Sequence, residues 1–555
     1  MDAQRTILIV ALLVVSYLMV LAWNEDYGQQ PFTQQSTTQT ETQPGDSQTT
    51  GTPGAQLELP ENAQAPVVSN GTVATTEAGT IRVETDVLSL EISRQGGNLV
   101  EALLKEHQRT LNSPQPLSIL ETGQRMYVLQ TGLLGRNGID AGSQPPVYGS
   151  SSQTYSLAEG ADNLTVDLTH ATPDGVTITK RYQFTRGSYE IKIDYLIDNQ
   201  SANPWAGNFS AKILRDRSPD PSQTTALGMQ SFLGVVLSTD MERYEKYNFD
   251  DLSSRPLKID TTNGWIAFLQ HYFVAALIPP KDSQPTFQAK IANGNYLLGY
   301  VLPQTVVQPG ETGTVGASTY IGPKIMDYLE QAAPNLDLTV DFGWLWFVAK
   351  PLFLLLDFFH DFVKNWGVAI ILLTVLIKLL FFPLSAASYR SMANMRRVAP
   401  ELQRLKELYG DDRQKMSQAM MEMYRKEKIN PLGGCLPILV QMPVFIALYW
   451  VLAESVQLRH APFMLWIQDL SVKDPYFILP LLMGATMFIQ MSLNPTPPDP
   501  VQARVMKLMP IIFTVFFLWF PAGLVLYWLV NNILSIAQQW YITRQIEQGA
   551  QAKKA

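Results

Sequence analysis

The chain has 555 residues, enough for several domains, with a formal net charge of −8 and a mean hydropathy of +0.00. Its one cysteine, Cys435, excludes an intrachain disulfide, so an exported domain must be held together by its own core. Charge and hydropathy are averages over two unlike halves, because residues 24–340 are polar and strand-patterned whereas residues 344–540 are mostly apolar with basic loops.

The first 23 residues predict a transmembrane anchor. An apolar run from Ile7 to Trp23 follows Arg5 and the free amino terminus. A cleaved signal peptide is the alternative, since Val20-Leu21-Ala22 is a weak cleavage site. The apolar run reaches that point without a polar region, and Trp23 suits a membrane interface, so residues 1–23 favour an uncleaved anchor. In both cases the residues that follow are exported.

Two regions with different composition come next. Residues 24–78 are rich in Gln, Thr, Pro, Gly and Ser with almost no large apolar residues, and they are expected to form a disordered periplasmic tether. Residues 79–340 instead alternate apolar and polar side chains, as in VTITKRYQF (176–184) and YEIKIDYLI (189–197). With turn residues between such runs, this region predicts a large all-β sandwich.

The β-patterned region lacks the motifs of an enzyme. Its three histidines, His107, His170 and His271, are widely spaced and show no metal-ligand pattern. The sequence has no nucleophile elbow, HExxH motif or glycine-rich phosphate loop. We therefore predict no catalytic residue, no metal site and no cofactor, while a binding cleft on the sandwich stays open as an alternative.

Residues 344–364, WLWFVAKPLFLLLDFFHDFVK, predict an amphipathic helix in the membrane interface. Their charged residues Lys350, Asp357, Asp361 and Lys364 share one helical face, and the remainder is mostly apolar or aromatic. A second membrane span is the alternative, but four charges in one stripe make a poor surface for lipid contact.

The apolar run from Trp366 to Pro383 is about long enough to cross a bilayer, yet it contains Lys378. Thr374 lies one helical turn earlier on the same face. A lysine deep in the bilayer costs roughly 2.5–3.5 kcal/mol on insertion scales, so such residues usually face a protein interior or a wet cavity. The alternative is that Lys378 extends to the headgroups.

Residues 389–428 predict a cytoplasmic helical hairpin. The segment holds ten Lys/Arg against six Asp/Glu, and Gly410-Asp411-Asp412 is typical of a break between two helices. Methionine faces suit varied apolar partners, so the hairpin is a candidate site for receiving nascent chains. Its candidate contact residues are Arg396, Arg397, Met416, Met420 and Met423. The alternative for most of them is that the two apolar stripes pack against each other.

Four more apolar stretches follow, at roughly 433–453, 476–491, 508–520 and 523–540. Placing the Lys/Arg-rich links in the cytoplasm yields six spans with both termini inside, and the alternation never conflicts. The β-patterned region and the link 454–475 are then outside, and the tail 542–555 is cytoplasmic. Three spans are shorter than the ~20 residues normally needed, and short spans thin the bilayer around them.

Polar residues recur within these spans. They are Gln441, Gln490, Asn531, Asn532 and Gln538. Each one alone is typical of an interhelical hydrogen bond. Together with Lys378 they predict a helical bundle that is wet on its cytoplasmic side.

Three long motifs in the second half are specific enough to indicate a family. They are INPLGGCLPILVQMPVFIALYWVL (429–452), LPLLMGATMF (479–488) and MPIIFTVFFLWFPAGLVLYWLVNN (509–532). These motifs closely resemble the YidC/Oxa/Alb family of membrane-protein insertases. The resemblance is dense over residues 366–541, and the anchor, tether and exported β domain match the layout of its Gram-negative members.

The resemblance implies a fold and a mechanism. Five of the six spans would form an insertase core around a hydrophilic groove, and the periplasmic domain would be a β-supersandwich. A positive charge in the groove would attract the polar or acidic segment of an incoming protein. That charge falls on Lys378, with Thr374 beside it, although the family usually has arginine there and lysine lacks its planar fork. The resemblance also places the aromatic residues Tyr527 and Trp528 near the substrate path. From the polar residues within the spans, Gln441, Asn531 and Asn532 are predicted to line the same groove.

The resemblance also implies partners and a location. The protein would lie in the bacterial inner membrane and act on nascent membrane proteins, alone or with the Sec translocon. Membrane lipids, the ribosome and the signal recognition particle pathway are further candidate partners, and no nucleic-acid binding of its own is expected. Two alternatives from other classes are a groove-type transporter or lipid scramblase and a carbohydrate-binding module on an anchor. No convincing internal repeat supports the transporter, and nothing catalytic supports the carbohydrate module.

Overall fold

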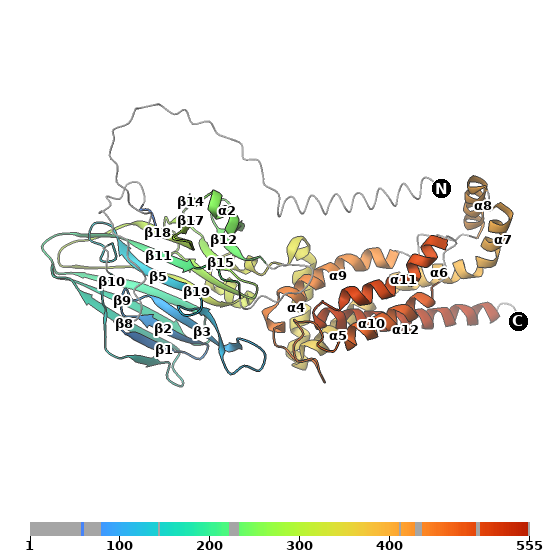
Figure 1. Ribbon diagram of the computed structural model, residues 1–555, viewed down its shortest axis with the longest axis horizontal. Coiled ribbons are helices and arrows are strands. Elements are labelled where there is room, and N and C mark those ends of the chain that lie inside the picture. The colour runs from blue at the N-terminus through green and yellow to red at the C-terminus, as the bar shows by residue number, and fades with distance from the viewer. Residues whose placement is uncertain are drawn as a thin grey trace, which may run out of the picture. The chain divides into compact units, whose positions relative to one another are not determined.

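The computed structural model describes residues 57–59, 79–141, 145–220, 232–409, 412–427, 436–494 and 500–552. The predicted anchor, residues 1–23, and most of the predicted tether lie outside the described residues. The chain forms two compact units, a β unit and a helical unit (Figure 1). The β unit comprises Gly51–Asp341 with Glu454–His460, and the helical unit includes Phe342–Ala453 and Ala461–Ala555.

The β unit consists of two large sheets, which confirms the prediction of a β-rich domain. One sheet has the strand order β14 (Leu257–Asp260), β17 (Thr286–Ala292), β18 (Asn295–Val307), β11 (Trp205–Arg215), β5 (Tyr127–Leu134), β3 (Leu99–Gln108), β2 (Leu88–Ser93), β1 (Thr80–Glu84) and β7 (Thr154–Ser156), with β4 (Pro116–Leu120) on β3. The other has the order β13 (Glu245–Asn248), β12 (Gly234–Ser238), β15 (Trp265–Leu269), β16 (Phe273–Ile278), β19 (Glu311–Pro323), β10 (Glu190–Asn199), β9 (Val176–Thr185), β8 (Asn163–Ala171) and β6 (Gly149–Ser150). Two short helices, α2 (Phe249–Ser254) and α3 (Met326–Ala332), complete this unit.

Aromatic side chains join the two sheets face to face. The ring of Tyr195 on β10 meets Phe209 on β11 edge-on, with ring centroids 5.8 Å apart. Tyr300 on β18 lies 6.2 Å from Phe209 and 5.9 Å from Phe287 on β17. Because strand side chains alternate between faces, the residues next to Phe287 and Tyr300 project from the other face of their sheet, away from this core.

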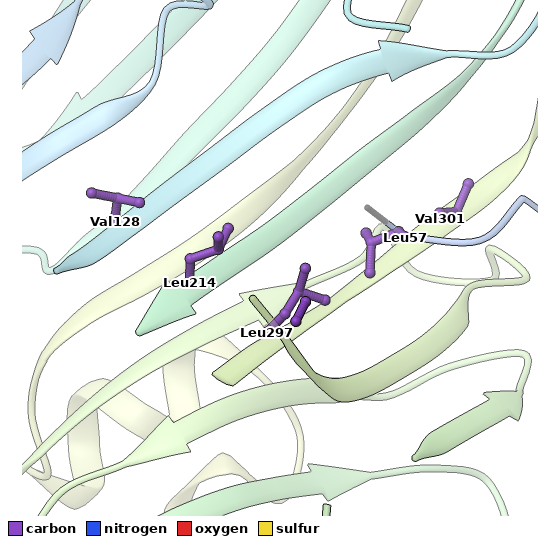
Figure 2. Close-up of a cluster of buried hydrophobic side chains, with 6 residues drawn as sticks. Leu57, Val128, Leu214, Leu297 and Val301 are labelled. Carbon is purple, nitrogen blue, oxygen red and sulfur yellow. The ribbon is translucent and has the colours of Figure 1, made fainter. Parts of the chain in front are cut away.

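A short part of the predicted tether is folded. Leu57 is 6% exposed and packs in an apolar cluster on the first sheet, and Leu59 packs against it (Figure 2). The prediction that residues 24–78 are disordered throughout is therefore wrong for residues 57–59. The composition of the whole segment hides two leucines that flank one glutamate and supply enough local apolar surface to dock.

The helical unit consists of nine α-helices within its described residues. They are α4 (Trp346–Val363), α5 (Trp366–Leu380), α6 (Phe382–Arg397), α7 (Ala399–Tyr409), α8 (Arg413–Lys426), α9 (Leu436–Glu454), α10 (Ile478–Ser492), α11 (Pro500–Phe517) and α12 (Ala522–Ala552). Among these, α12 packs against α5, α6 and α10, and α4 packs against α5.

The helix boundaries differ from the predicted spans in three places. The predicted run 366–383 is divided, because α5 ends at Leu380 and α6 begins at Phe382. The predicted link 492–507 is partly helical, since α11 begins at Pro500, a residue suited to a first helical turn. The tail is largely helical because α12 continues to Ala552.

No helix in the described part of the chain is, by itself, both long and apolar enough to be a membrane-span candidate. The helix pair Trp366–Leu380 and Phe382–Met395 meets that criterion together and is bent by 64° at the break between its two members.

Candidate functional site

Lys378, the lysine within the predicted apolar run 366–383, lies inside the helical bundle. Lys378, near the end of α5, is 8% exposed, and its Nζ donates a 2.8 Å hydrogen bond to Oγ of Ser535 on α12. The Ser535 hydroxyl in turn donates to the backbone carbonyl of Asn531 over 2.7 Å. The amine is thus directed at α12 through a hydroxyl that has an acceptor of its own.

Two other side chains join α12 to the helices beside Lys378. The hydroxyl of Tyr389 on α6 lies 3.4 Å from the backbone carbonyl of Ser535. The Gln538 side-chain amide lies 3.4 Å from the backbone carbonyl of Lys378. These long contacts and the Lys378–Ser535 hydrogen bond bring α5, α6 and α12 together around the cation.

Thr374 lies in the same buried region but does not bind Lys378. It is 1% exposed, and its hydroxyl donates to the carbonyl of Ile370 on its own helix over 2.7 Å. This bond within the helix satisfies the hydroxyl locally, so the shared helical face does not become a direct contact.

One stretch of α12 carries polar atoms that lack partners. Oδ1 of Asn531, Oε1 of Gln538 and Oε1 of Gln539 are buried and accept no hydrogen bond from the described residues. Leaving such a carbonyl oxygen buried and unpaired costs free energy, so these atoms normally take a water molecule or a ligand donor. The stretch therefore presents acceptors close in sequence to Ser535, the partner of Lys378.

Two further predicted residues form bonds between helices. Nε2 of Gln441 on α9 donates to the hydroxyl of Tyr527 on α12 over 2.8 Å. Nδ2 of Asn532 donates to Oγ1 of Thr486 on α10 at 3.4 Å. Both residues act as interhelical hydrogen-bonding groups here, the role that each was expected to have singly.

Trp528 lies in an aromatic cluster rather than among the polar side chains. Its ring meets Phe445 of α9 edge-on at 4.5 Å and lies 5.3 Å from Phe517 and 6.2 Å from Phe513 of α11. This cluster closes the space between α9, α11 and the first turns of α12. Tyr527 is also 6.3 Å from Phe445, so the two predicted aromatic residues lie on the same side of the bundle.

In the hairpin, the apolar stripes of α7 and α8 face each other. Met423 is 8% exposed and clusters with Val398, and Leu402, Leu405 and Tyr424 pack against the pair. This packing is the alternative that was left open for these residues, and it accounts for Met423. The burial also raises the pKa of Tyr424.

The remaining predicted hairpin residues are less buried. Met416 and Met420 are half-buried on α8. Arg397 is exposed at the end of α6, with its guanidinium 3.3 Å from the carboxylate of Glu427. Arg396 belongs to α6, but its side chain lies outside the described residues.

Sequence reasoning missed Ser535 and Tyr389, which contact the region of the cation. Ser535 stands four residues after Asn531 and three before Gln538, which puts all three on one helical face. This spacing could have identified Ser535 from the sequence. Tyr389 had no such signal, because its contact with Ser535 joins α6, beyond the 64° bend after α5, to α12.

The described residues contain no group of three or more His, Cys, Asp or Glu side chains that could hold a metal ion. The arrangement around Lys378 offers an amine, the hydroxyl of Ser535 and several hydrogen-bond acceptors. Its chemistry is that of binding a polar or anionic group.

Two family models match nearly the whole described chain. The family described as "60Kd inner membrane protein" matches residues 358–550, and the one described as "YidC periplasmic domain" matches residues 80–355. The first contains the helices around Lys378, and the second contains both β sheets.

Full-length relatives agree with these matches. A protein of Marinobacter nauticus named "Membrane protein insertase YidC" is 59% identical over 571 residues, covering 100% of both chains. Proteins with the same name from Hahella chejuensis and Pseudomonas fluorescens are 59% and 54% identical, covering 100% of this chain and 99% and 100% of their own.

Proposed function

The chain belongs to the YidC family of membrane protein insertases, and on this premise we propose that it inserts integral proteins into the bacterial inner membrane through a cytoplasm-open groove around Lys378. The family consists of insertases and not of enzymes, and it places this chain in the inner membrane with a periplasmic domain. The resemblance read from the three sequence motifs is thereby confirmed.

The observation that carries the groove proposal is the position of the Lys378 amine. It is directed to Ser535 in the bundle rather than outward, which favours an internal role over extension to the headgroups. An ammonium has three N–H donors, and an incoming carboxylate or backbone carbonyl is a suitable acceptor for those that Ser535 does not take.

The mechanism follows from desolvation. Moving a polar segment through hydrocarbon is slow because each unpaired polar group pays a large free-energy cost. The unpartnered oxygens of Asn531, Gln538 and Gln539 offer acceptors to the N–H groups of such a segment, and Lys378 attracts its acidic residues. The apolar helix of the substrate then moves sideways into lipid, and the polar segment continues to the exported side.

The aromatic cluster around Trp528 supports a groove that does not pass right through the bundle. Phe445, Phe513 and Phe517 surround the indole, and such a layer excludes water between the helices that it joins. In this proposal the cluster closes the groove on the exported side, while the polar part near Ser535 opens toward the cytoplasm.

The proposed topology has six spans with both termini in the cytoplasm. The helices α5 with the start of α6, α9, α10, α11 and α12 would form the five core spans, and residues 1–23 would form the anchor. The amphipathic helix α4 would lie in the membrane interface, because Trp346, Phe347, Phe358 and Phe362 are all exposed. The helical hairpin would receive nascent chains, and the Sec translocon, the ribosome and the signal recognition particle pathway are proposed partners.

Site-specific crosslinking to a stalled nascent membrane protein tests this function. Photoreactive residues at positions 374, 378 and 528 should crosslink to the nascent chain in native membranes. Leu379 provides a matched control, because it is 64% exposed and adjoins Lys378 on α5. Crosslinking at position 379 but at none of the other three would contradict the groove.

A further inference from the structure

Residues 57–59, the sequence Leu-Glu-Leu, occupy a site on the face of the first sheet that points away from the sandwich core. Figure 2 shows Leu57 beside Val301, with Leu297, Leu214 and Val128 on successive strands. These residues occupy the face opposite to Phe287 and Tyr300, whose rings face the core. These four apolar side chains form a strip across β18, β11 and β5, on the face of the sheet that does not contribute to the sandwich core.

The backbone of Glu58 is bound by one side chain. Oε1 of Gln288 accepts from the Glu58 N–H at 2.8 Å, and Nε2 of Gln288 donates to the Glu58 carbonyl at 2.6 Å. Gln288 is 2% exposed, so this amide is fixed in place by its surroundings. The pair of bonds recognises an extended backbone, because it engages the N–H and C=O of a single residue as a neighbouring strand would.

Two lysines bind the carboxylate that projects from this backbone. Nζ of Lys258 on β14 is 3.2 Å from Oε2 of Glu58, and Nζ of Lys290 on β17 is 3.7 Å from Oε1. The hydrogen bond from Lys258 lowers the pKa of the Glu58 carboxyl and so favours its ionised form. The site thus combines an apolar strip, a backbone clamp and a cationic pair.

From these contacts we propose that the outer face of the first sheet is a peptide-binding site, which the chain's own Leu57–Leu59 occupies in cis and which accepts extended apolar–acidic–apolar segments of other exported proteins in trans. We call it the tether site and define it by Val128, Leu214, Leu297, Val301, Gln288, Lys258 and Lys290.

The bound segment Leu57–Leu59 indicates which sequence a partner needs in order to bind. Gln288 engages only backbone atoms, which every peptide has, whereas the apolar strip and the lysines select a leucine followed by an acidic residue. The lysines that bind Glu58 are partly exposed, with side-chain exposures of 44% for Lys258 and 22% for Lys290, so a competing peptide can reach this part of the site. The covalent connection gives the cis segment a high effective concentration, and a partner in trans must overcome that advantage.

The test uses the full-length protein and a fluorescent peptide of residues 55–61, AQLELPE. Fluorescence anisotropy would compare the unmodified protein with an opened variant, Leu57→Ser with Leu59→Ser. We expect the peptide to bind the opened variant at least tenfold more tightly, because the cis competitor has lost its apolar contacts. The matched control is Val67→Ser with Val68→Ser, two apolar residues of the same tether, and it should behave as the unmodified protein does.

Three further measurements test the chemistry of the site. Gln288→Ala in the opened background should abolish binding, and the peptide AQLKLPE should bind at least tenfold more weakly because its lysine faces Lys258 and Lys290. In the unmodified protein, a large excess of AQLELPE should increase hydrogen exchange at residues 57–59. Equal binding by the unmodified and opened proteins, or no binding by the opened variant while its circular dichroism is unchanged, would overturn the proposal.

Discussion

The Lys378 amine and the Ser535 hydroxyl, 157 positions apart in the chain, lie 2.8 Å apart inside the helical unit. Both side chains are buried, at 8% and 3% exposure. The hydroxyl takes one N–H of the amine, and no carboxylate among the described residues pairs with it, so the protonated amine can still attract an incoming anion. The relationship is the physical basis of the first two predictions.

Reversing the charge at position 378 should impair insertion selectively. A pair of unit charges about 8 Å apart interacts by about 2 kcal/mol at an effective dielectric constant of 20, which is more than tenfold in an equilibrium constant. We therefore expect Lys378→Glu to slow insertion of substrates with acidic exported tails by roughly tenfold or more. Lys378→Arg keeps the charge and should retain most of the activity. Protease protection of substrates in reconstituted vesicles measures both, and equal insertion by the two variants would rule out the electrostatic role.

Removing the partner of Lys378 should destabilise the helical unit. Ser535→Ala takes away the hydroxyl that accepts from the ammonium, and losing a hydrogen bond to a charged group costs about 1.5–3 kcal/mol. Thermal unfolding in detergent should show a lowered transition temperature. Ser492→Ala is the control, because Ser492 is on α10 and its hydroxyl makes an exposed bond to the Ile489 carbonyl. Similar transition temperatures for the two variants would count against the contact.

Deleting most of the periplasmic domain, about residues 80–310, should leave insertion largely intact. The proposed groove residues all belong to the helical unit, which has its own helix packing. Insertion would be assayed in vesicles after the truncated protein is shown to be folded in the membrane. A folded truncated protein that inserts no substrate would show that the β unit takes part in the reaction.

The β unit should show a pH dependence that originates in its core. Lys180 on β9 is fully buried, and its amine donates to the carbonyls of Gly96 and Thr131 at 3.0 and 3.2 Å. Burial lowers the pKa of Lys180 to about 7 and raises the pKa of the neighbouring Asp140 to about 6. Their titrations are linked, since each charge favours the other, and Lys212 and His170 also act on Asp140.

Stability changes with pH wherever the folded and unfolded states bind different numbers of protons, and it rises with pH where the unfolded state binds more. Between about pH 7 and the ordinary lysine pKa of 10.5, the unfolded state is protonated at Lys180 and the folded state is not, so stability rises with pH. Between the ordinary Asp pKa of 3.8 and about pH 6 the folded state holds the extra proton at Asp140, so stability falls as pH rises. Denaturant unfolding should therefore show a slope that begins near pH 7 in the unmodified protein. In Lys180→Met the slope should be smaller and begin near pH 8, where burial of Lys212 places its lowered pKa. Asp140→Asn should move the onset near pH 7 to lower pH, and an unmoved onset would contradict the coupling.

Much of the fold was predictable because the relevant signals are local. The alternation in residues 176–184 and 189–197 predicted strands, and these residues form β9 and β10. Gln441 and Asn532 were predicted to line the substrate groove, with interhelical hydrogen bonds as the reading of each residue alone, and each makes such a bond in the structure. Lys378 stood out because a lysine in an apolar run is costly wherever that run is buried.

Other features could not be predicted, because they depend on contacts between distant residues. Average composition predicted a disordered tether, yet the strip on β5, β11 and β18 gives Leu57 a place to dock. The contact between Tyr389 and Ser535 crosses from α6 to α12 and follows the 64° bend after α5, for which Pro383 was a local signal whose consequence for Tyr389 could not be read from spacing. Thr374 shares a helical face with Lys378, but its hydroxyl bonds to its own helix instead.

Three features followed from the amino-acid sequence without a structure: the family, the division into a strand-patterned and an apolar half, and the lysine within an apolar run. Each of these is carried by residue type and short-range spacing, which folding does not change. The folded chain was needed to show that the Lys378 amine donates to Ser535 and that Leu57 lies on the outer face of a sheet. Such pairings depend on how separate helices and strands pack, and that information is spread over the whole chain.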